Sequence, residues 1–338
     1  MINHFTVCSV ATNNYLHYAL AFYTSLQRSN PGVAFTLFTL GDIHASDSLY
    51  LKNQCPSLTI VRIEEILSPT SFARYVANYT PFEVSCAVRG ICHQFINDTT
   101  SYEAWLMLDL DTAIVYSLES TIAILENTSI FLTAHCSLPV ALDDAIPFEK
   151  NLLVNGLYNG GVVGFRRSNE TTLALSWLAS RLEHYSESSR ARIAEGLDRK
   201  DDCFFVDQLW LNLLPLYFSS STYISSDPCH NLGHWNLWQG KLTRGTTNYE
   251  YFFDERNVVI LHFSGLPKDN LEFVTIHTSL YADQPCVAWG DASRIFMQDL
   301  EKAKSLLTFS QYSYVNISPK RKPTILERVK QKLLGSLN

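Results

Sequence analysis

Apolar runs and helical spacings alternate along the first sixty residues of the chain. Residues 5–11, 34–40 and 58–63 are mostly apolar, which is typical of buried strands. Between them, residues 15–28 and 46–54 carry apolar positions at the spacing of a helix. A strand–helix–strand–helix–strand order of this kind predicts a parallel sheet wound with helices.

The rest of the chain continues this mixture. Residues 72–97 have helical spacing, interrupted at Thr80 and Pro81, whereas residues 138–151 have the character of a loop. Further helices are predicted at 122–126, 171–185 and 204–217, and further strands at 105–116, 129–134, 156–165 and 257–263. The sequence therefore predicts an α/β fold with a mixed, mostly parallel sheet flanked by helices.

The stretch 105–116 is the most informative part of the pattern. Four apolar residues lead directly into Asp109 and Asp111, which only Leu110 separates. Because side chains alternate along a strand, both carboxylates are expected on the same side. Two carboxylates at the carboxyl end of a parallel strand suit Mg²⁺ or Mn²⁺, and open α/β sheets bind their ligands at that edge. The alternative is a pair of solvated aspartates in a turn.

A second polar group follows the last predicted strand, with His262, Gly265 and Lys268 in close succession. A neutral imidazole could complete the coordination of a cation held by two aspartates. The lysine could reach a phosphate, and the glycine would let the backbone close over it. Together these groups suit a diphosphate leaving group, because the cation and the lysine neutralise charge that develops as the bond breaks.

Taken in order, the motifs resemble those of glycosyltransferases with the GT-A fold, and most closely the retaining enzymes of glycosyltransferase family 8. The resemblance spans residues 5–270 and is carried by residues 11–15 (ATNNY), 108–111 (LDLD), 158–161 (YNGG), 207–212 (DQLWLN) and 262–268 (HFSGLPK). Asp269 and Asn270 stand where that family usually continues with Pro-Trp. Residues 79–89 and 227–237 look more like a bacterial group of polysaccharide glycosyltransferases.

The resemblance implies a metal-dependent transfer of a hexose from a nucleotide sugar, a UDP-hexose, to a glycan or lipid-linked saccharide. The implied site comprises a metal set (Asp109, Asp111 and His262), donor-binding residues (Thr12, Tyr15, Arg89, Asp109, Gly265 and Lys268), and residues at the sugar and the reacting centre (Asn159, Asp207 and Gln208).

The stereochemical course stays open at this point. A retaining transfer needs no dedicated base, because the departing phosphate oxygen can accept the proton. An inverting transfer would need a carboxylate that reaches the acceptor hydroxyl, and Asp207 is the candidate. Residues 231–236 would line the acceptor side in either case, or else pack as an aromatic-rich loop.

The resemblance also divides the chain. Residues 1–270 would form the catalytic domain, with a nucleotide-binding half to about residue 115 and an acceptor half beyond it, and residues 271–338 a helical extension. Residues 319–338 are basic in an otherwise acidic chain, with apolar positions on one helical face. That pattern suits a helix lying on an anionic membrane surface, although an ordinary helix packed on the domain has a similar pattern.

Composition sets further bounds. With 46% hydrophobic and 17% charged residues among 338, the chain can bury a sizeable core, and its net charge of −7 does not suggest nucleic-acid binding. Eight cysteines without a Cys-x-x-Cys pair favour reduced thiols over disulfides or zinc. We see no signal peptide and no apolar run of membrane-spanning length, so we expect a cytoplasmic enzyme, peripheral at most on the inner membrane face.

Two other classes of protein remain open. A non-catalytic module that binds sugar nucleotides or glycans could share the fold, but loss of Asp109, Asp111 or His262 would be expected there. A metal-dependent nucleotidyltransferase or phosphohydrolase would need further carboxylates beside the strand, and Asp143 and Asp144 are the nearest rivals.

Overall fold

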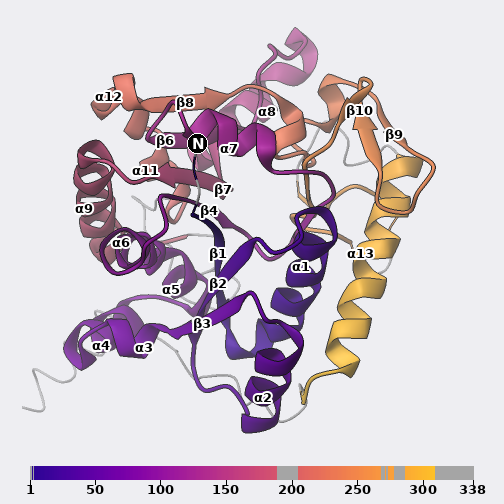
Figure 1. The fold of residues 1–338 in the computed structure, drawn as a ribbon. Helices are drawn as coiled ribbons and strands as arrows, with labels where there is room; N and C mark the ends of the chain where they lie inside the picture. Colours follow the sequence, from indigo (N-terminus) through magenta and orange to yellow (C-terminus); the bar gives the residue numbers. More distant parts are fainter. Residues whose placement is uncertain are drawn as a thin grey trace, which may run out of the picture.

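A computed structural model of the chain describes residue 2 and residues 4–188, 205–267, 271, 273–277 and 286–308 (Figure 1). Within this part, seven strands form one sheet in the order β3-β2-β1-β4-β7-β6-β8. They are β1 (Phe5–Thr12), β2 (Ala34–Leu40), β3 (Leu58–Arg62), β4 (Ala104–Leu108), β6 (Ile130–Ala134), β7 (Tyr158–Arg166) and β8 (Thr222–Ser225). Only β7 runs antiparallel to its neighbours, β4 and β6, among the pairs of this sheet. The predicted mixed, mostly parallel sheet is confirmed.

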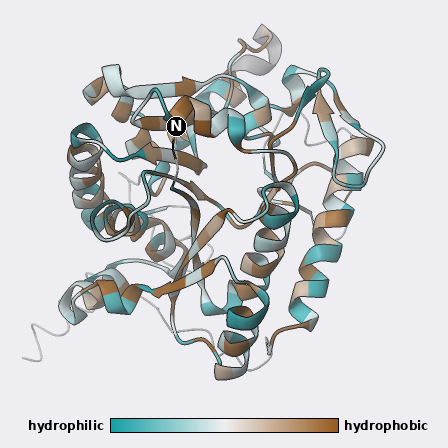
Figure 2. Ribbon diagram, viewed as in Figure 1, coloured by the Kyte–Doolittle hydropathy of each residue, from teal (hydrophilic) through white to brown (hydrophobic). Residues whose placement is uncertain are grey.

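Helices cover both faces of this sheet. Successive side chains of the central strands point to opposite faces, so Val7 and Leu106 pack in one core and Cys8 and Met107 in the other. The first core lies under α1 (Leu16–Ser29), α2 (Ala45–Gln54) and α13 (Val287–Ser305), and the second under α4 (Pro69–Asn78), α5 (Pro81–Ala87), α6 (Arg89–Thr99) and α9 (Asn169–His184). Figure 2 shows the hydrophobic residues gathered along the central strands.

The helical stretch predicted at 72–97 breaks where the sequence indicates. Thr80 caps α5 by accepting a hydrogen bond from the Glu83 backbone N–H, and the Glu83 carboxylate accepts one from the Thr80 N–H. Pro81 stands at the first position of the helix, where its missing N–H costs nothing. This capping box marks the break between α4 and α5, and α6 begins at Arg89.

The single strand predicted at 105–116 is wrong in one respect, because the chain turns at the aspartates. β4 ends at Leu108, and β5 (Thr112–Ile114) belongs to a separate two-stranded sheet with β12 (Ile260–His262). The turn is closed by the Thr112 hydroxyl, which donates to the Asp109 carbonyl over 2.6 Å. Asp109 and Asp111 therefore lie at the junction of two sheets, and not within one strand.

The loop predicted at 138–151 is also wrong, since α8 spans Leu142–Asn155. Pro147 inside the segment reads as a helix breaker, yet the helix tolerates it and ends only at Gly156, whose φ of 120° suits glycine. In Figure 1, α8 projects from the body of the molecule. Asp143 and Asp144 lie in this helix, and their role as rival metal ligands stays a prediction.

Shorter elements complete the described part. They are α3 (Ile63–Ile66), α7 (Glu119–Leu125), α11 (Gln208–Leu211), α12 (Leu214–Tyr217), four 3₁₀ turns (Asn13–Tyr15, Ser219–Ser221, Pro228–His230 and Leu237–Gln239), and a sheet of β9 (Leu242–Arg244), β10 (Tyr251–Phe253) and β11 (Arg256–Asn257). The helix predicted at 204–217 is thus two short helices, and the strand predicted at 257–263 is interrupted between β11 and β12.

Part of the predicted C-terminal extension is a helix packed on the main domain. α13 lies along α1, where Arg28 forms an ion pair with Asp299 (3.3 Å) and the rings of Tyr18 and Phe296 are 6.2 Å apart. The domain limits at residues 115 and 270 stay predictions, and the basic tail 319–338 lies outside the described residues. In the described part, every helix is too short or too polar to cross a membrane.

Candidate active site

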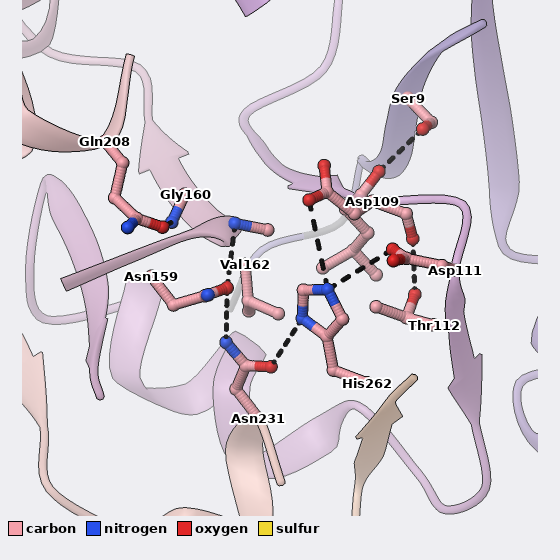
Figure 3. Close-up of polar contacts among 12 residues, drawn as sticks. Ser9, Asp109, Asp111, Thr112, Asn159, Gly160, Val162, Gln208, Asn231 and His262 are labelled. Carbon is pink, nitrogen blue, oxygen red and sulfur yellow. Dashed lines mark hydrogen bonds and ion pairs between the residues drawn. The ribbon is translucent and has the colours of Figure 1, made fainter. Parts of the chain in front are cut away.

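The metal ligands predicted from the sequence come together at the edge where the two sheets meet. β12 pairs antiparallel with β5 in a register that sets His262 opposite Thr112, and so beside the turn that carries the two aspartates. His262 Nε2 lies 3.2 Å from Asp111 Oδ1 and 3.9 Å from Asp109 Oδ2 (Figure 3). One potential ligand atom from each of the three residues lies within 4.8 Å of the others.

This donor set fits a divalent cation. Two carboxylates and one imidazole are ligands that Mn²⁺ accepts, and Mg²⁺ shares the preference for carboxylate oxygen. The strand β7 makes room for them, because Gly161 faces the group directly. A Cβ atom at position 161 would collide with His262 Cε1 and lie 2.8 Å from Asp109 Oδ2. A glycine here leaves the space between the three side chains open.

The charges in the group are mutually dependent. Burial lowers the pKa of His262, but the carboxylates of Asp111 and Asp109 more than offset this, so that its pKa lies above the ordinary value. Burial raises the pKa of Asp111, and the His262 imidazole and a backbone hydrogen bond outweigh it, so that its pKa lies below the ordinary value. Without a cation, His262 therefore neutralises part of the negative charge that the site holds ready for a metal.

Arg89 lies on the other side of Asp109. Its guanidinium forms an ion pair with Asp109, donates from Nη1 to Asp207 Oδ2 over 3.0 Å, and donates from Nη1 to the Gly160 carbonyl over 2.9 Å. Burial raises the pKa of Asp207, and Arg89 counteracts this only in part. Arg89 thus connects the end of β4 to the start of α11, and the positive charge predicted for the donor diphosphate is held between two carboxylates.

Gln208 and Asn212 bind the chain that leads into β7. Gln208 Oε1 accepts the Gly160 N–H (3.0 Å) while its Nε2 donates to the Asn155 carbonyl (2.6 Å). Asn212 Oδ1 accepts the Leu157 N–H over 2.9 Å. The motif at 207–212 therefore fixes the backbone from Asn155 to Gly160 against α11, a structural task that the motif alone does not reveal.

Asn159, predicted at the reacting centre, is buried and points into the protein. Its Oδ1 accepts the Gly161 N–H (2.9 Å) and a hydrogen bond from Asn231 Nδ2 (3.0 Å), and its Nδ2 donates to His135 Nε2 over 3.0 Å. Asn231 Oδ1 in turn contacts His262 Nδ1 at 3.1 Å. Sequence reasoning missed His135, since nothing in the spacing of β6 and β7 links it to the site.

The segment 231–236 was expected to line the acceptor side, and its main side chains lie in the interior instead. Asn231, Trp235 and Asn236 are each at most 4% exposed. The Trp235 ring stands edge-on to His262, with centroids 5.0 Å apart, and Asn236 Nδ2 donates to the Asn231 carbonyl. The alternative of an aromatic-packed loop describes these side chains, and the segment supports His262 from behind.

The residues predicted to contact the nucleotide lie at the end of β1. The Thr12 hydroxyl donates to Asn14 Oδ1 over 2.5 Å, and Tyr15 is half exposed, with its ring 5.1 Å from that of Tyr18. The sequence did not single out Tyr18. Burial raises the pKa of its hydroxyl most, and Tyr15 and Asp111 raise it further.

Of the motif at residues 262–268, the structure describes residues 262–267. Gly265 has a φ of 66°, in the left-handed region, and its carbonyl accepts the Ile276 N–H over 2.8 Å. A side chain there would meet His277 and Thr275. Lys268 lies outside the described residues, so its predicted contact with a phosphate stays a prediction.

Comparison with known proteins identifies the fold of the chain. No protein-family model and no curated protein matches the chain. Among solved structures, the galactosyltransferase LgtC, determined in complex with donor and acceptor sugar analogues, is 16% identical with a TM-score of 0.52, over 90% of this chain and 96% of LgtC.

Two further solved structures are similar at a lower level. The glycosyltransferase GlyE of Streptococcus pneumoniae is 14% identical (TM-score 0.45, 91% of this chain and 66% of GlyE). Mouse xyloside xylosyltransferase 1 is also 14% identical (TM-score 0.44, 76% of this chain and 97% of the mouse protein). The likeness to LgtC shows that the chain has the GT-A glycosyltransferase fold, whereas membership of family 8 in particular stays a prediction.

Proposed function

We propose that this chain is a metal-dependent glycosyltransferase that moves a hexose from a nucleotide sugar, a UDP-hexose, to a glycan or lipid-linked saccharide. The observation that supports it most is the convergence of Asp109, Asp111 and His262 at the junction of two sheets in a GT-A fold. A loss of any of the three would have favoured a binding module, and all three side chains face one another.

In this proposal, Asp109, Asp111 and His262 hold Mn²⁺ or Mg²⁺. The cation supplies positive charge to the donor diphosphate, which makes the nucleotide a better leaving group. Thr12 and Tyr15 contact the nucleotide, and Lys268 and Gly265 close over the phosphates. Arg89 adds a fixed positive charge next to Asp109, where negative charge accumulates as the glycosidic bond breaks.

A retaining course is the one we propose. Asp207 is 6% exposed, and its Oδ2 accepts a hydrogen bond from Arg89, so this carboxylate is better placed to hold Arg89 than to reach an acceptor hydroxyl as a base. In a retaining transfer the acceptor proton passes to the departing phosphate oxygen, and no protein base is needed. Asn159 and Gln208 act by shaping the backbone at Gly160 and Gly161 around the sugar.

The location of the acceptor belongs to the same proposal. The basic, amphipathic pattern of residues 319–338 supports attachment to the anionic inner face of the cytoplasmic membrane, where lipid-linked saccharides are extended. Binding of the full chain to vesicles with and without anionic lipid tests this part separately from catalysis.

A two-step screen tests the proposed activity. Thermal unfolding is measured with a panel of nucleotide sugars, with and without Mn²⁺, and each stabilising donor is then assayed for release of the nucleotide diphosphate. The proposal predicts a metal-dependent rise in Tm with UDP-sugars, followed by turnover. Stabilisation by UDP with Mn²⁺ but no turnover of any donor would support the binding module instead, and stabilisation by none of the donors would contradict both.

A further inference from the structure

His262 is held from behind by a chain of polar side chains that reaches across three other elements. The chain runs from His262 at the end of β12 to Asn231, then to Asn159 on β7, and then to His135 just after β6. All four side chains are buried. Figure 3 shows Asn231 and Asn159 on the side of the imidazole opposite to Asp109 and Asp111.

The direction of each hydrogen bond in this chain follows from two backbone groups. The Gly156 carbonyl can only accept, so His135 Nδ1, 2.9 Å away, carries a proton, and His135 Nε2 is left as an acceptor for Asn159 Nδ2. At the other end of the same amide, Asn159 Oδ1 accepts the Gly161 N–H. The orientation of the Asn159 amide is therefore fixed at both ends.

The orientation of the Asn159 amide determines that of the Asn231 amide, which contacts His262. Because Asn159 Oδ1 is an acceptor, the Asn231 atom 3.0 Å from it must be the NH₂ group, which also donates to Thr133 Oγ1 over 2.9 Å. Asn231 Oδ1 is then the atom that faces His262, and it can only accept. His262 Nδ1 must carry a proton, and the lone pair of the neutral ring is on Nε2, the atom that faces Asp111.

We propose that Asn231, anchored through Asn159 to His135, is a positioning residue that fixes His262 in the Nδ1–H tautomer and directs its Nε2 toward the divalent cation. The inference rests on the cation site of the proposed function, and it assigns to the 227–237 segment a task other than contact with the acceptor. Outer partners of this kind typically change metal affinity by about 10–100-fold when they are removed.

The test compares three variants of the full chain. Asn231→Leu removes the acceptor for His262 Nδ1 at nearly constant volume, Asn231→Asp keeps an acceptor, and Asn97→Leu is the control. Asn97 is a buried asparagine on α6 that donates to Asp98 and Thr172, so it matches Asn231 in burial but not in contact with His262. Each variant is first compared with the wild type by circular dichroism and thermal unfolding.

Two readouts are used, neither of which needs turnover. The first is the Kd for Mn²⁺ by electron paramagnetic resonance, which should rise about 10–100-fold in Asn231→Leu and stay within about twofold in Asn97→Leu. The second is the tautomer of His262 in the metal-free protein, from ¹⁵N chemical shifts of labelled imidazole in its neutral form. We expect Nδ1–H in the wild type and in Asn231→Asp, and a loss of this preference in Asn231→Leu.

The two readouts separate failure of this inference from failure of the proposed function. A folded Asn231→Leu variant with wild-type Mn²⁺ affinity, or a wild-type His262 protonated on Nε2 alone, would overturn the role of Asn231. A wild-type protein that binds no Mn²⁺ would overturn the cation site itself, and the proposal with it, whatever the tautomer. Failure of donor turnover with normal Mn²⁺ binding would concern only the proposed function.

Discussion

Arg89 and Asp207, which are 118 residues apart in the sequence, form a buried ion pair with a distance of 3.0 Å between Nη1 and Oδ2. The same guanidinium pairs with Asp109, whose other oxygen faces His262 at 3.9 Å. Asp109 thus lies between a permanent cation and an imidazole, while Asp207 depends on Arg89 alone among the ion pairs of the described part. Arg89 therefore neutralises Asp207 and at the same time touches the metal group through Asp109.

Replacement of Arg89 by alanine should destabilise the protein through Asp207. The variant leaves a buried carboxylate without its cation, which costs about 3–5 kcal/mol of unfolding free energy near pH 7. Burial already raises the pKa of Asp207, and loss of Arg89 raises it further. A raised carboxyl pKa in the folded state means that stability returns as the pH falls through it, so the deficit should shrink between pH 8 and pH 5.

The control for this prediction removes the charge of Asp207 by mutation instead of by lowering the pH. Arg89→Ala combined with Asp207→Asn should be more stable at pH 7 than Arg89→Ala alone, and its deficit relative to the wild type should vary little with pH. Urea unfolding of the three proteins at each pH measures the differences. An Arg89→Ala deficit that is constant from pH 8 to pH 5 would show that Asp207 does not carry it.

The affinity for Mn²⁺ should fall as the pH is lowered. An imidazolium cannot bind a cation, so below the raised pKa of His262 the affinity should drop about tenfold per pH unit and level off above it. Titrations followed by electron paramagnetic resonance at a series of pH values measure the inflection. An affinity that is flat from ordinary histidine pKa values upward and declines only below them would contradict the coupling to Asp111.

His93 provides the control for this pH dependence. It is buried against Trp105 and Phe165, and burial and Arg89 lower its pKa to about 3, so it stays neutral over the whole range of the titration. Its Nδ1 accepts a hydrogen bond from Trp105 Nε1, which a glutamine can also accept. His93→Gln should therefore leave the inflection in Mn²⁺ affinity where it is.

Adjacent glycines on β7 should differ sharply when each is replaced by alanine. A Cβ at Gly161 collides with His262 Cε1 and approaches Asp109 Oδ2 to 2.8 Å, so Gly161→Ala should raise the Kd for Mn²⁺ by about tenfold or more. A Cβ at Gly160 meets Asp207 Oδ2 at 3.3 Å and Arg89 Nη1 at 3.6 Å, contacts that a small shift relieves. Gly160→Ala should bind Mn²⁺ as the wild type does, and equal effects at both positions would argue against the assigned site.

Exchange of Gln208 for glutamate should weaken the anchor of β7. Glutamate can still accept the Gly160 N–H, but its second oxygen would face the Asn155 carbonyl in place of a donor. Leaving these groups unmatched costs about 1–3 kcal/mol of unfolding free energy. Gln27 is a less buried match, since it also accepts from a glycine N–H and donates to a carbonyl, and Gln27→Glu should cost less in urea unfolding.

The sequence predicts the sheet well where apolar runs are continuous. The strand predicted at 34–40 coincides with β2, and the strand–helix alternation of the first sixty residues is present with ends displaced by one or two positions. Burial on both faces makes such strands apolar at most positions, and their short length favours strands over helices. The pattern fails where one residue type has two uses, as with Pro147, which breaks most helices but is accommodated in α8.

The three metal ligands can be predicted from the sequence, but the residues that surround them cannot. Asp109 follows the end of β4, Asp111 precedes β5, and His262 is the last residue of β12, so all three stand at strand ends, where ligands commonly bind. The Asn231–Asn159–His135 chain joins residues 24 and 72 positions apart, and no period or spacing indicates these contacts. The motif at 207–212 likewise shows that Gln208 is needed, but only the fold shows that its amide holds the backbone of β7.

If Asp109, Asp111 and His262 hold the cation that sugar transfer needs, loss of one ligand should abolish the effect of Mn²⁺ on donor turnover. Release of UDP from the best donor is followed with and without Mn²⁺ in the wild type, Asp111→Asn and His262→Ala, after unfolding curves show that the variants are folded. We predict that Mn²⁺ stimulates the wild type and that both variants lose this stimulation. Full metal-stimulated activity in both variants would show that these residues do not hold the cation.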